Sequence, residues 1–392
     1  TAIGQNSMES NTTGEKNTAV GTGSLPANTT GSKNIAIGYL ALQSNTTASN
    51  NTALGQEALK ANTTGEDNVA VGKDALKANT TAINNTGIGT NALTANTTGN
   101  HNTSVGQSSL KANTTGANNT ALGRVALFAN TTADDNTAIG YSALLSNTTG
   151  AENTSVGATA LDANTTGGKN CAIGVGALTD NTTGSNNNAM GENALANNTT
   201  ASNNVGIGGD ALKDSTTGGS LVAVGVNAGQ NLSSGHNNTY VGAFAGEQHT
   251  DGSGNTVLGY NAQLSAASIS NQFVLGSSNV DDLRCNDTSI SGLSDSRDKT
   301  DVVDLPIGLS FVNSIRPVKF KWASRDGNGN DGKIRAGFLA QELQIASADA
   351  TYLNLVQEDN PDKLCAKYAN LLPVMVQAIK ELSAKVTALE AG

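Results

Sequence analysis

The chain has 392 residues, a formal net charge of −10 at pH 7 and only 3% aromatic residues. An acidic surface repels phosphate groups, so this balance argues against nucleic acid or an anionic membrane as a partner. No apolar run is long enough to span a bilayer, and the three cysteines lack the spacing of a disulfide framework or a metal site. We therefore expect no membrane insertion, no metal and no cofactor.

Composition divides the chain near residue 290. Residues 1–293 contain one proline and no tryptophan, whereas the segment from Ser294 onward carries four prolines and Trp322. That segment has 12 Lys+Arg against 13 Asp+Glu, so almost all of the net negative charge belongs to the first region. The sequence therefore predicts two regions of different architecture.

A 17-residue unit fills the first region. Its frame, NTTGSKNIAIGYLALQS from Asn28 to Ser44, recurs without insertion or deletion in fifteen full copies that start at residue 11. A fixed period this short suits short strands joined by turns, so it predicts a parallel β-solenoid, or β-roll. The predicted shaft covers residues 1–265 and, at roughly 4.8 Å per rung, is about 70 Å long.

Each position of the unit, numbered from its first asparagine, has an expected role. N-T-A-I-G, as in Asn136 to Gly140, is predicted to be a strand that ends at the glycine of position 11. The Ala-Leu pair at positions 14 and 15 is predicted to form a second strand or a turn. N-T-T-G is predicted to be the corner, because asparagine and glycine tolerate left-handed backbone. We expect the aliphatic side chains of positions 10 and 15 to be buried within each rung.

One rung cannot stabilise itself. Two buried aliphatic side chains offset only a small part of the conformational entropy that seventeen ordered residues lose. Stacked backbone hydrogen bonds, asparagine ladders and burial between chains must supply the remainder. The composition of the unit therefore predicts an oligomeric rod.

The N-T-A-I-G motif resembles the N-S-V-A-I-G motif in the head repeats of trimeric autotransporter adhesins. The resemblance covers residues 1 to about 265 and implies a homotrimer of left-handed parallel β-rolls. The period of 17 residues is longer than the usual head repeat, which leaves handedness and cross-section open. Residues 266–293, with apolar residues alternating at Phe273 and Leu275, are predicted to be a neck of short strands that cap the solenoid.

Three motifs follow in order after residue 293. They are S-D-x-R-x-K at Ser294 to Lys299, then R-P-V-x-F-x-W, then G-F-L-A-Q-E-L. Together they resemble the intramolecular chaperone domain of phage endosialidases and tail fibres. The resemblance implies an α+β domain over residues 294–392 that trimerises and cleaves itself off between Leu293 and Ser294. It assigns the nucleophile to Ser294 and the general base to Lys299.

The pairing of a serine with a lysine is chemically coherent. A serine hydroxyl is a poor nucleophile unless a base takes its proton, and a lysine can act as that base once desolvation lowers its pKa. Assembly of a trimer would supply that desolvation. The alternative interpretation is that S-D-S-R-D-K is only a polar linker.

Residues from about 366 to 390 are predicted to form a helix. Its apolar residues are spaced alternately by four and three positions, which predicts a coiled-coil seam. The seam consists of Tyr368, Leu372, Met375, Ile379, Leu382, Val386 and Leu389. The alternative is an amphipathic helix that packs on a globular core.

Three further features have structural explanations. The stretch Asp326–Gly332 lacks the glycine and glutamate that an EF-hand calcium loop needs at its sixth and twelfth positions, so a hairpin tip is favoured. His101, His236 and His249 are isolated and are expected at the surface or in turns. Asn-Thr-Thr matches the N-glycosylation sequon, but its corner role already accounts for it.

Near-identical repeats leave the register between chains undefined, because a slip of 17 residues matches almost as well. A terminal domain that trimerises first would align three chains. Together with the resemblance to the chaperone domain of tail fibres, this leads us to expect a trimeric phage tail fibre that cleaves only itself. The expected partners are a host-surface glycan or protein and other tail proteins on the N-terminal side. The expected location is the virion tail, after assembly in the host cytoplasm. The alternatives are a bacterial surface trimeric adhesin and a glycan-degrading tailspike.

Overall fold

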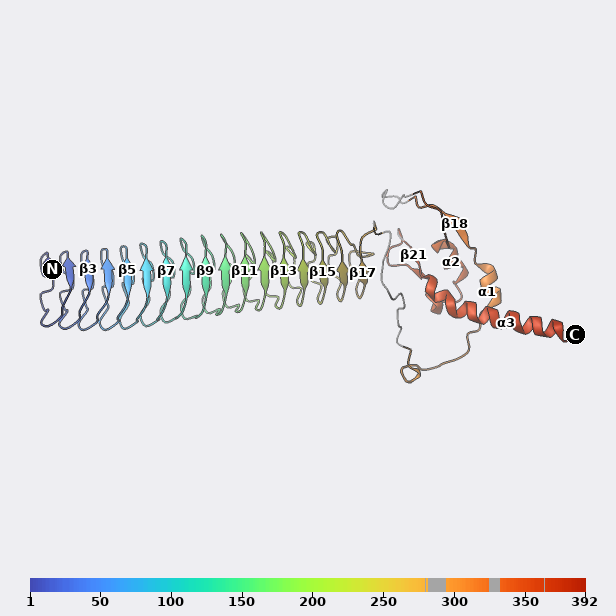
Figure 1. The fold of residues 1–392 in the computed structure, drawn as a ribbon, viewed down its shortest axis with the longest axis horizontal. Helices are drawn as coiled ribbons and strands as arrows, with labels where there is room; N and C mark the ends of the chain where they lie inside the picture. Colours follow the sequence, from blue (N-terminus) through green and yellow to red (C-terminus); the bar gives the residue numbers. More distant parts are fainter. Residues whose placement is uncertain (279, 281–293, 324–331, 363) are drawn as a thin grey trace. The chain divides into compact units, whose positions relative to one another are not determined.

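The computed structural model describes residues 1–278, 280, 294–323, 332–362 and 364–392. They form two compact units, Thr1–Leu275 and Gly276–Gly392. The first unit is a parallel β-solenoid whose successive turns stack as rungs along one axis (Figure 1). The predicted mainly-β fold, with a parallel β-solenoid of 17-residue repeats, is therefore confirmed.

Seventeen short strands form the sheet of the shaft. Their bounds are β1 (Ala2–Ile3), β2 (Thr18–Val20), β3 (Ile35–Ile37), β4 (Thr52–Leu54), β5 (Val69–Val71), β6 (Thr86–Ile88), β7 (Thr103–Val105), β8 (Thr120–Leu122), β9 (Thr137–Ile139), β10 (Thr154–Val156), β11 (Cys171–Ile173), β12 (Asn188–Met190), β13 (Val205–Ile207), β14 (Val222–Val224), β15 (Thr239–Val241), β16 (Thr256–Leu258) and β17 (Phe273–Leu275). They occupy positions 8 to 10 of the unit, except that β1 covers only positions 9 and 10. Residues 17 apart are partners, such as Thr154 and Cys171. The pairing of β17 with β16 carries the solenoid past residue 265, into the segment predicted as a neck.

The strands do not bury the side chains that were expected to be buried. The alanine at position 9 points inward and is fully buried, as at Ala138. The aliphatic residue at position 10 points outward, and Leu122 and Met190 are almost half exposed. A Cβ on Gly206, at position 9, would lie 3.2 Å from Leu195 of position 15, so the interior is already filled. The expectation that position 10 is buried within its own rung was wrong, because adjacent strand residues face opposite sides.

The Ala-Leu segment is a turn, not a second strand. Each of the twelve leucines at position 15, from Leu25 to Leu212, has a left-handed backbone with φ between +47° and +56°. All twelve are fully buried. A left-handed backbone costs a residue with a Cβ about 1–2 kcal/mol, and burial of the leucine side chain offsets that cost. Position 15 therefore reverses the chain and fills the core at the same time.

The left-handed residues are not the ones that were expected at the corner. They lie at positions 6, 13 and 15, while the asparagine of position 1 and the glycine of position 4 have ordinary backbone. The glycine of position 11 has a different role. Gly140 has φ of +138°, and a Cβ there would lie 2.4 Å from the carbonyl oxygen of Gly157 in the next rung. Rungs can stack at β-sheet spacing only with glycine at position 11.

Two asparagine ladders run through the shaft, as expected. At position 1, Asn164 donates through Nδ2 to Asn147 Oδ1 (2.8 Å) and to the carbonyl of Gly167 (2.9 Å). At position 7, Asn153 donates to the same carbonyl (2.9 Å), and its Oδ1 accepts the backbone N–H of Asn170 (3.0 Å). Because these side chains are buried and their amides are engaged, the Asn-Thr-Thr sequons are not accessible in the folded shaft.

The position-1 ladder ends where Ser215 replaces asparagine. Asn198 still donates to Asn181 Oδ1 (2.8 Å), but the shorter serine side chain does not reach back to it. Among the described residues, Asn198 Oδ1 and Ser215 Oγ are buried without a hydrogen-bond partner. Each such group costs about 1–3 kcal/mol. The end of the ladder is therefore a weak point in the core.

An aromatic side chain fills the core in the rung after that of Ser215. Tyr240 takes the place of the position-9 alanine and is fully buried, and the position-15 leucine is replaced by Gly229 and Gly246 on either side. A Cβ on Gly246 would lie 2.2 Å from the tyrosine ring, so these glycines make room for it. The hydroxyl lies 2.5 Å from Nδ1 of His249, which is only 1% exposed. His249 lies at position 1, the corner of its unit, but it is buried and not at the surface, whereas His101 and His236 are exposed.

The second unit is a small α+β domain. Its strands and helices are η1 (Ser296–Asp298), α1 (Leu309–Ser314), β18 (Val318–Phe320), β19 (Arg335–Gly337), α2 (Ala340–Ala346), η2 (Thr351–Leu353), β20 (Val356–Gln357), β21 (Cys365–Ala366), η3 (Tyr368–Leu371) and α3 (Leu372–Glu390). β18 pairs antiparallel with β19, and β20 with β21. The predicted hairpin tip at 326–332 lies almost wholly outside the described residues. The core includes Phe311, Leu343, Leu353, Leu371 and Val374.

Helix α3 presents its apolar seam away from this core. Val374 and Ala378 are its buried residues and α1 packs against it. Of the predicted seam residues, Tyr368 lies in η3 and packs edge-on against Phe338. The six in α3 lie on another side of the helix, and Leu372, Ile379 and Leu389 are 64%, 65% and 82% exposed. Among the described residues, no helix has both the length and the apolar character needed to cross a membrane.

Candidate functional site

The candidate site is a tight turn that begins at Ser294. Asp295 is the N-cap of η1, and its Oδ1 accepts the backbone N–H of Arg297 (2.9 Å). Aspartate is a preferred N-cap because its carboxylate satisfies an N–H that has no partner within the helix. The turn brings the next side chains back toward Ser294, and Nζ of Lys299 donates to Ser294 Oγ at 2.6 Å. The two residues that the resemblance assigned to chemistry are therefore in direct contact.

The second basic residue of the motif is held elsewhere. Nε of Arg297 donates to both carboxylate oxygens of Asp295, at 3.0 and 3.1 Å, and a guanidinium N–H donates to Oδ2 as well. This hydrogen bonding lowers the pKa of the Asp295 carboxyl and raises the pKa of Arg297. Both groups are exposed to solvent, so the pair orders the turn more than it stabilises the domain. Within the motif, Asp295 and Arg297 therefore form a pair that orders the turn, and Lys299 lies beside the serine.

The role of Asp295 was not anticipated from the sequence. It was counted as part of the S-D-x-R-x-K pattern, without a function of its own. The signal was present, because an aspartate directly before a short polar turn is a common N-cap. Leu293, on the other side of the predicted cleavage point, lies outside the described residues. The roles of Ser294 as nucleophile and Lys299 as base stay predictions.

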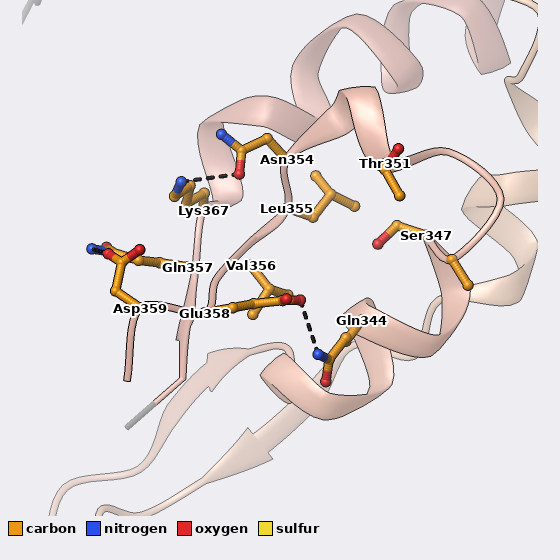
Figure 2. A pocket seen from close by; sticks show the side chains of 11 residues that line it. Gln344, Ser347, Thr351, Asn354, Leu355, Val356, Gln357, Glu358, Asp359 and Lys367 are labelled. Carbon is orange, nitrogen blue, oxygen red and sulfur yellow. Dashed lines mark hydrogen bonds between the residues drawn. The ribbon is translucent and has the colours of Figure 1, made fainter. Parts of the chain in front are cut away.

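A cavity of about 460 Å³ lies elsewhere in the domain, between α2 and β20 (Figure 2). On its walls, Gln344 donates to Glu358 Oε1 (2.9 Å) and Lys367 donates to Asn354 Oδ1 (3.1 Å). These contacts satisfy the side chains within the domain, so they give no reason to assign a ligand. Within the part of the chain that the structure describes, no three His, Cys, Asp or Glu side chains gather closely enough to hold a metal ion.

The comparison with known proteins points to the segment that begins at Ser294. No curated protein and no solved structure matched the chain. One family model did match, and its match begins at Ser294, includes Lys299 and extends through α2 to residue 352. Residues 294–352 are thus similar to the family described as chaperone of endosialidase.

Proposed function

We propose that the chain is a fibre protein whose C-terminal domain aligns three copies and then cuts itself off between Leu293 and Ser294. The observation that carries this proposal is the 2.6 Å contact between Lys299 Nζ and Ser294 Oγ, at the first residue of the matched segment. A neutral lysine in that position can accept the hydroxyl proton. Side chains of this kind become neutral when they are removed from water, which assembly of three copies would do.

The proposed chemistry takes place within one chain and happens once. Lys299 takes the proton from Ser294 Oγ, which attacks the carbonyl carbon of Leu293 to form a tetrahedral adduct. The C–N bond between the two residues then breaks, the amine of Ser294 takes up the proton, and an ester links Leu293 to Oγ. Water hydrolyses the ester to a carboxylate and restores the hydroxyl. No external substrate takes part.

Two features of the structure support a chaperone role. First, the rung-to-rung contacts are the same along most of the shaft, so they cannot distinguish the correct register between copies from a slip of one rung. Second, the seam of α3 is exposed within its own domain, and Leu372, Ile379 and Leu389 need a partner helix to be buried. A domain that trimerises through α3 would fix the chain ends before the rungs associate.

We further propose that the shaft belongs to a phage tail, is assembled in the host cytoplasm, and contacts a glycan or protein on the host surface. The N-T-A-I-G strands also favour a second candidate, a trimeric adhesin of the bacterial surface. Cell fractionation separates the two, because a tail fibre is recovered with virions and an adhesin with the cell envelope.

The cleavage proposal is tested by expressing the full chain and its Ser294→Ala variant. On a denaturing gel the unchanged chain should yield two fragments, and intact mass should place the cut after residue 293. The variant should remain a single band. Ser296→Ala, two residues away in the same turn, is the matched control and should cleave normally. A single full-length band from the unchanged chain would contradict self-cleavage.

A further inference from the structure

The outward face of the shaft sheet carries a continuous row of apolar side chains along its whole length. Position 10 is aliphatic in all seventeen strands, and this set of side chains is called the position-10 stripe here. It consists of Ile3, Val20, Ile37, Leu54, Val71, Ile88, Val105, Leu122, Ile139, Val156, Ile173, Met190, Ile207, Val224, Val241, Leu258 and Leu275. Its most exposed members outside the two end strands, Leu54, Leu122 and Met190, are 44–48% exposed.

The same face carries no charge. Position 8, which also points outward, is uncharged in each of the sixteen strands that include it, β2 to β17, and is most often threonine. Charged side chains gather instead at other positions of the unit. Position 13, for example, provides Glu57 and Asp74, which form ion pairs with Lys77 of position 16. The shaft therefore has one charge-free face with a continuous apolar stripe, and charged side chains lie on its other faces.

A surface of this length needs a partner of the same length and spacing. Isolated soluble proteins rarely leave a continuous apolar patch of this extent exposed. A partner would have to offer aliphatic side chains every 4.8 Å or so, which is the rung spacing. A second copy of the chain offers them. Copies related by rotation about a common axis bring like residues together, and a charge-free stripe is what allows that without repulsion.

We infer that the position-10 stripes of three copies turn toward a common axis and form the interface between the shafts. The number three rests on the proposed function, whereas the identity of the face rests on the stripe itself. On this inference, the position-10 side chain, which was expected inside its own rung, is buried between chains instead. The strand face is then the core of the assembly, and the corners and turns form its outer surface.

Cys171 offers a test within the native sequence. It occupies position 8 of β11, on the proposed interface, and is half-buried in the single chain. In a chain with Cys285→Ser and Cys365→Ser it is the sole cysteine. In register, the Cys171 side chains of neighbouring copies should lie close enough for a short bis-maleimide to join them. The expected result is covalent dimers in high yield on a denaturing gel. Efficient single labelling with no cross-link would overturn the inference.

The matched control places the cysteine on another face of the same rung. Thr166→Cys, with Cys171→Ser, puts it at position 3, which is exposed at the corner. This variant should label completely and form few cross-links. Cross-linking as efficient as that of Cys171 would also overturn the inference. Self-cleavage is scored on the same gel, so a failure of the interface and a failure of the proposed function are distinguishable.

A second test introduces charge. Val156→Lys places an ammonium group on the stripe, and Thr149→Lys places one at position 3 of the same rung. Light scattering should report loss of the trimeric rod for the first variant and an unchanged trimer for the second. An unchanged trimer for both would contradict the inference. If Val156→Lys does not fold, the cysteine experiment still decides.

Discussion

The end of the position-1 ladder offers a substitution that should stabilise the shaft. Ser215→Asn restores the residue found at this position in the preceding rungs. Its Nδ2 would donate to the unpaired Asn198 Oδ1 and to the carbonyl of Gly218, as the regular asparagines do. The buried Ser215 hydroxyl disappears, and the new Oδ1 is left facing Leu232. Two unpaired buried groups become one, which corresponds to a gain of about 1–3 kcal/mol.

The gain is measured as the midpoint of urea unfolding of the assembled shaft, followed by circular dichroism. Ser234→Asn is the matched control, since it makes the same change at an exposed corner and should leave the midpoint unchanged. The decisive comparison uses Asn198→Ala as a background. In that background the unpaired Oδ1 of residue 198 is absent, so the new amide satisfies no buried acceptor and Ser215→Asn should stabilise the shaft much less. An equal gain in both backgrounds, or a loss in the native one, would refute the reasoning.

Three further predictions concern other parts of the chain. Gly140→Ala puts a Cβ on a residue with φ of +138°, a conformation that L residues rarely adopt, and against the Gly157 carbonyl of the next rung, so it should cost more than about 2 kcal/mol. A Cβ on Gly150 would also lie close to the carbonyl of Gly167, but the backbone there is ordinary and four other rungs carry alanine at this position, so Gly150→Ala should be mild when both variants are compared by urea unfolding. Burial lowers the pKa of His249 below its ordinary value of 6.5. The contribution of the neutral His249 to stability is therefore complete above pH 6.5 and declines as the pH falls toward the lowered pKa. His249→Asn should flatten this part of the pH profile of the free energy of unfolding. Asp295→Ala removes the cap and should slow self-cleavage about 5–10-fold, while Asp295→Asn keeps the cap and should cleave at nearly the native rate in a timed gel assay.

The period of the sequence determines the pairing of the shaft but not the face that it buries. A repeat of 17 residues without insertions leaves one parallel register, and the strands lie where N-T-A-I-G predicts them. Alternation along a strand says only that Ala138 and Ile139 point to opposite sides. Size suggested the isoleucine for the interior, but the left-handed leucine of position 15 already occupies it. The sequence of one rung does not determine whether an apolar side chain is buried within a chain or between chains.

The candidate site shows a similar division. The resemblance identified Ser294 and Lys299, and their spacing of five residues is compatible with many backbone shapes. The contact depends on how the turn is built, and the turn depends on the Asp295 cap. The repeat pattern also did not predict that an aromatic residue, Tyr240, fills the core. Tyr240 is accommodated by Gly246 of its own rung and Gly229 of the preceding rung, and this compensation is visible only once the two rungs are stacked.

Because the contacts between rungs are uniform, the length of the shaft can change by whole rungs. Deleting or duplicating one whole unit upstream of Asn198 joins two rungs that present the same glycine, the same asparagines and the same leucine. Each such event would change the length by roughly 4.8 Å and create no new kind of contact. Recombination between near-identical stretches of the gene could therefore lengthen or shorten the fibre in single steps. The irregular rungs from Ser215 to Tyr240 would confine that variation to the N-terminal side.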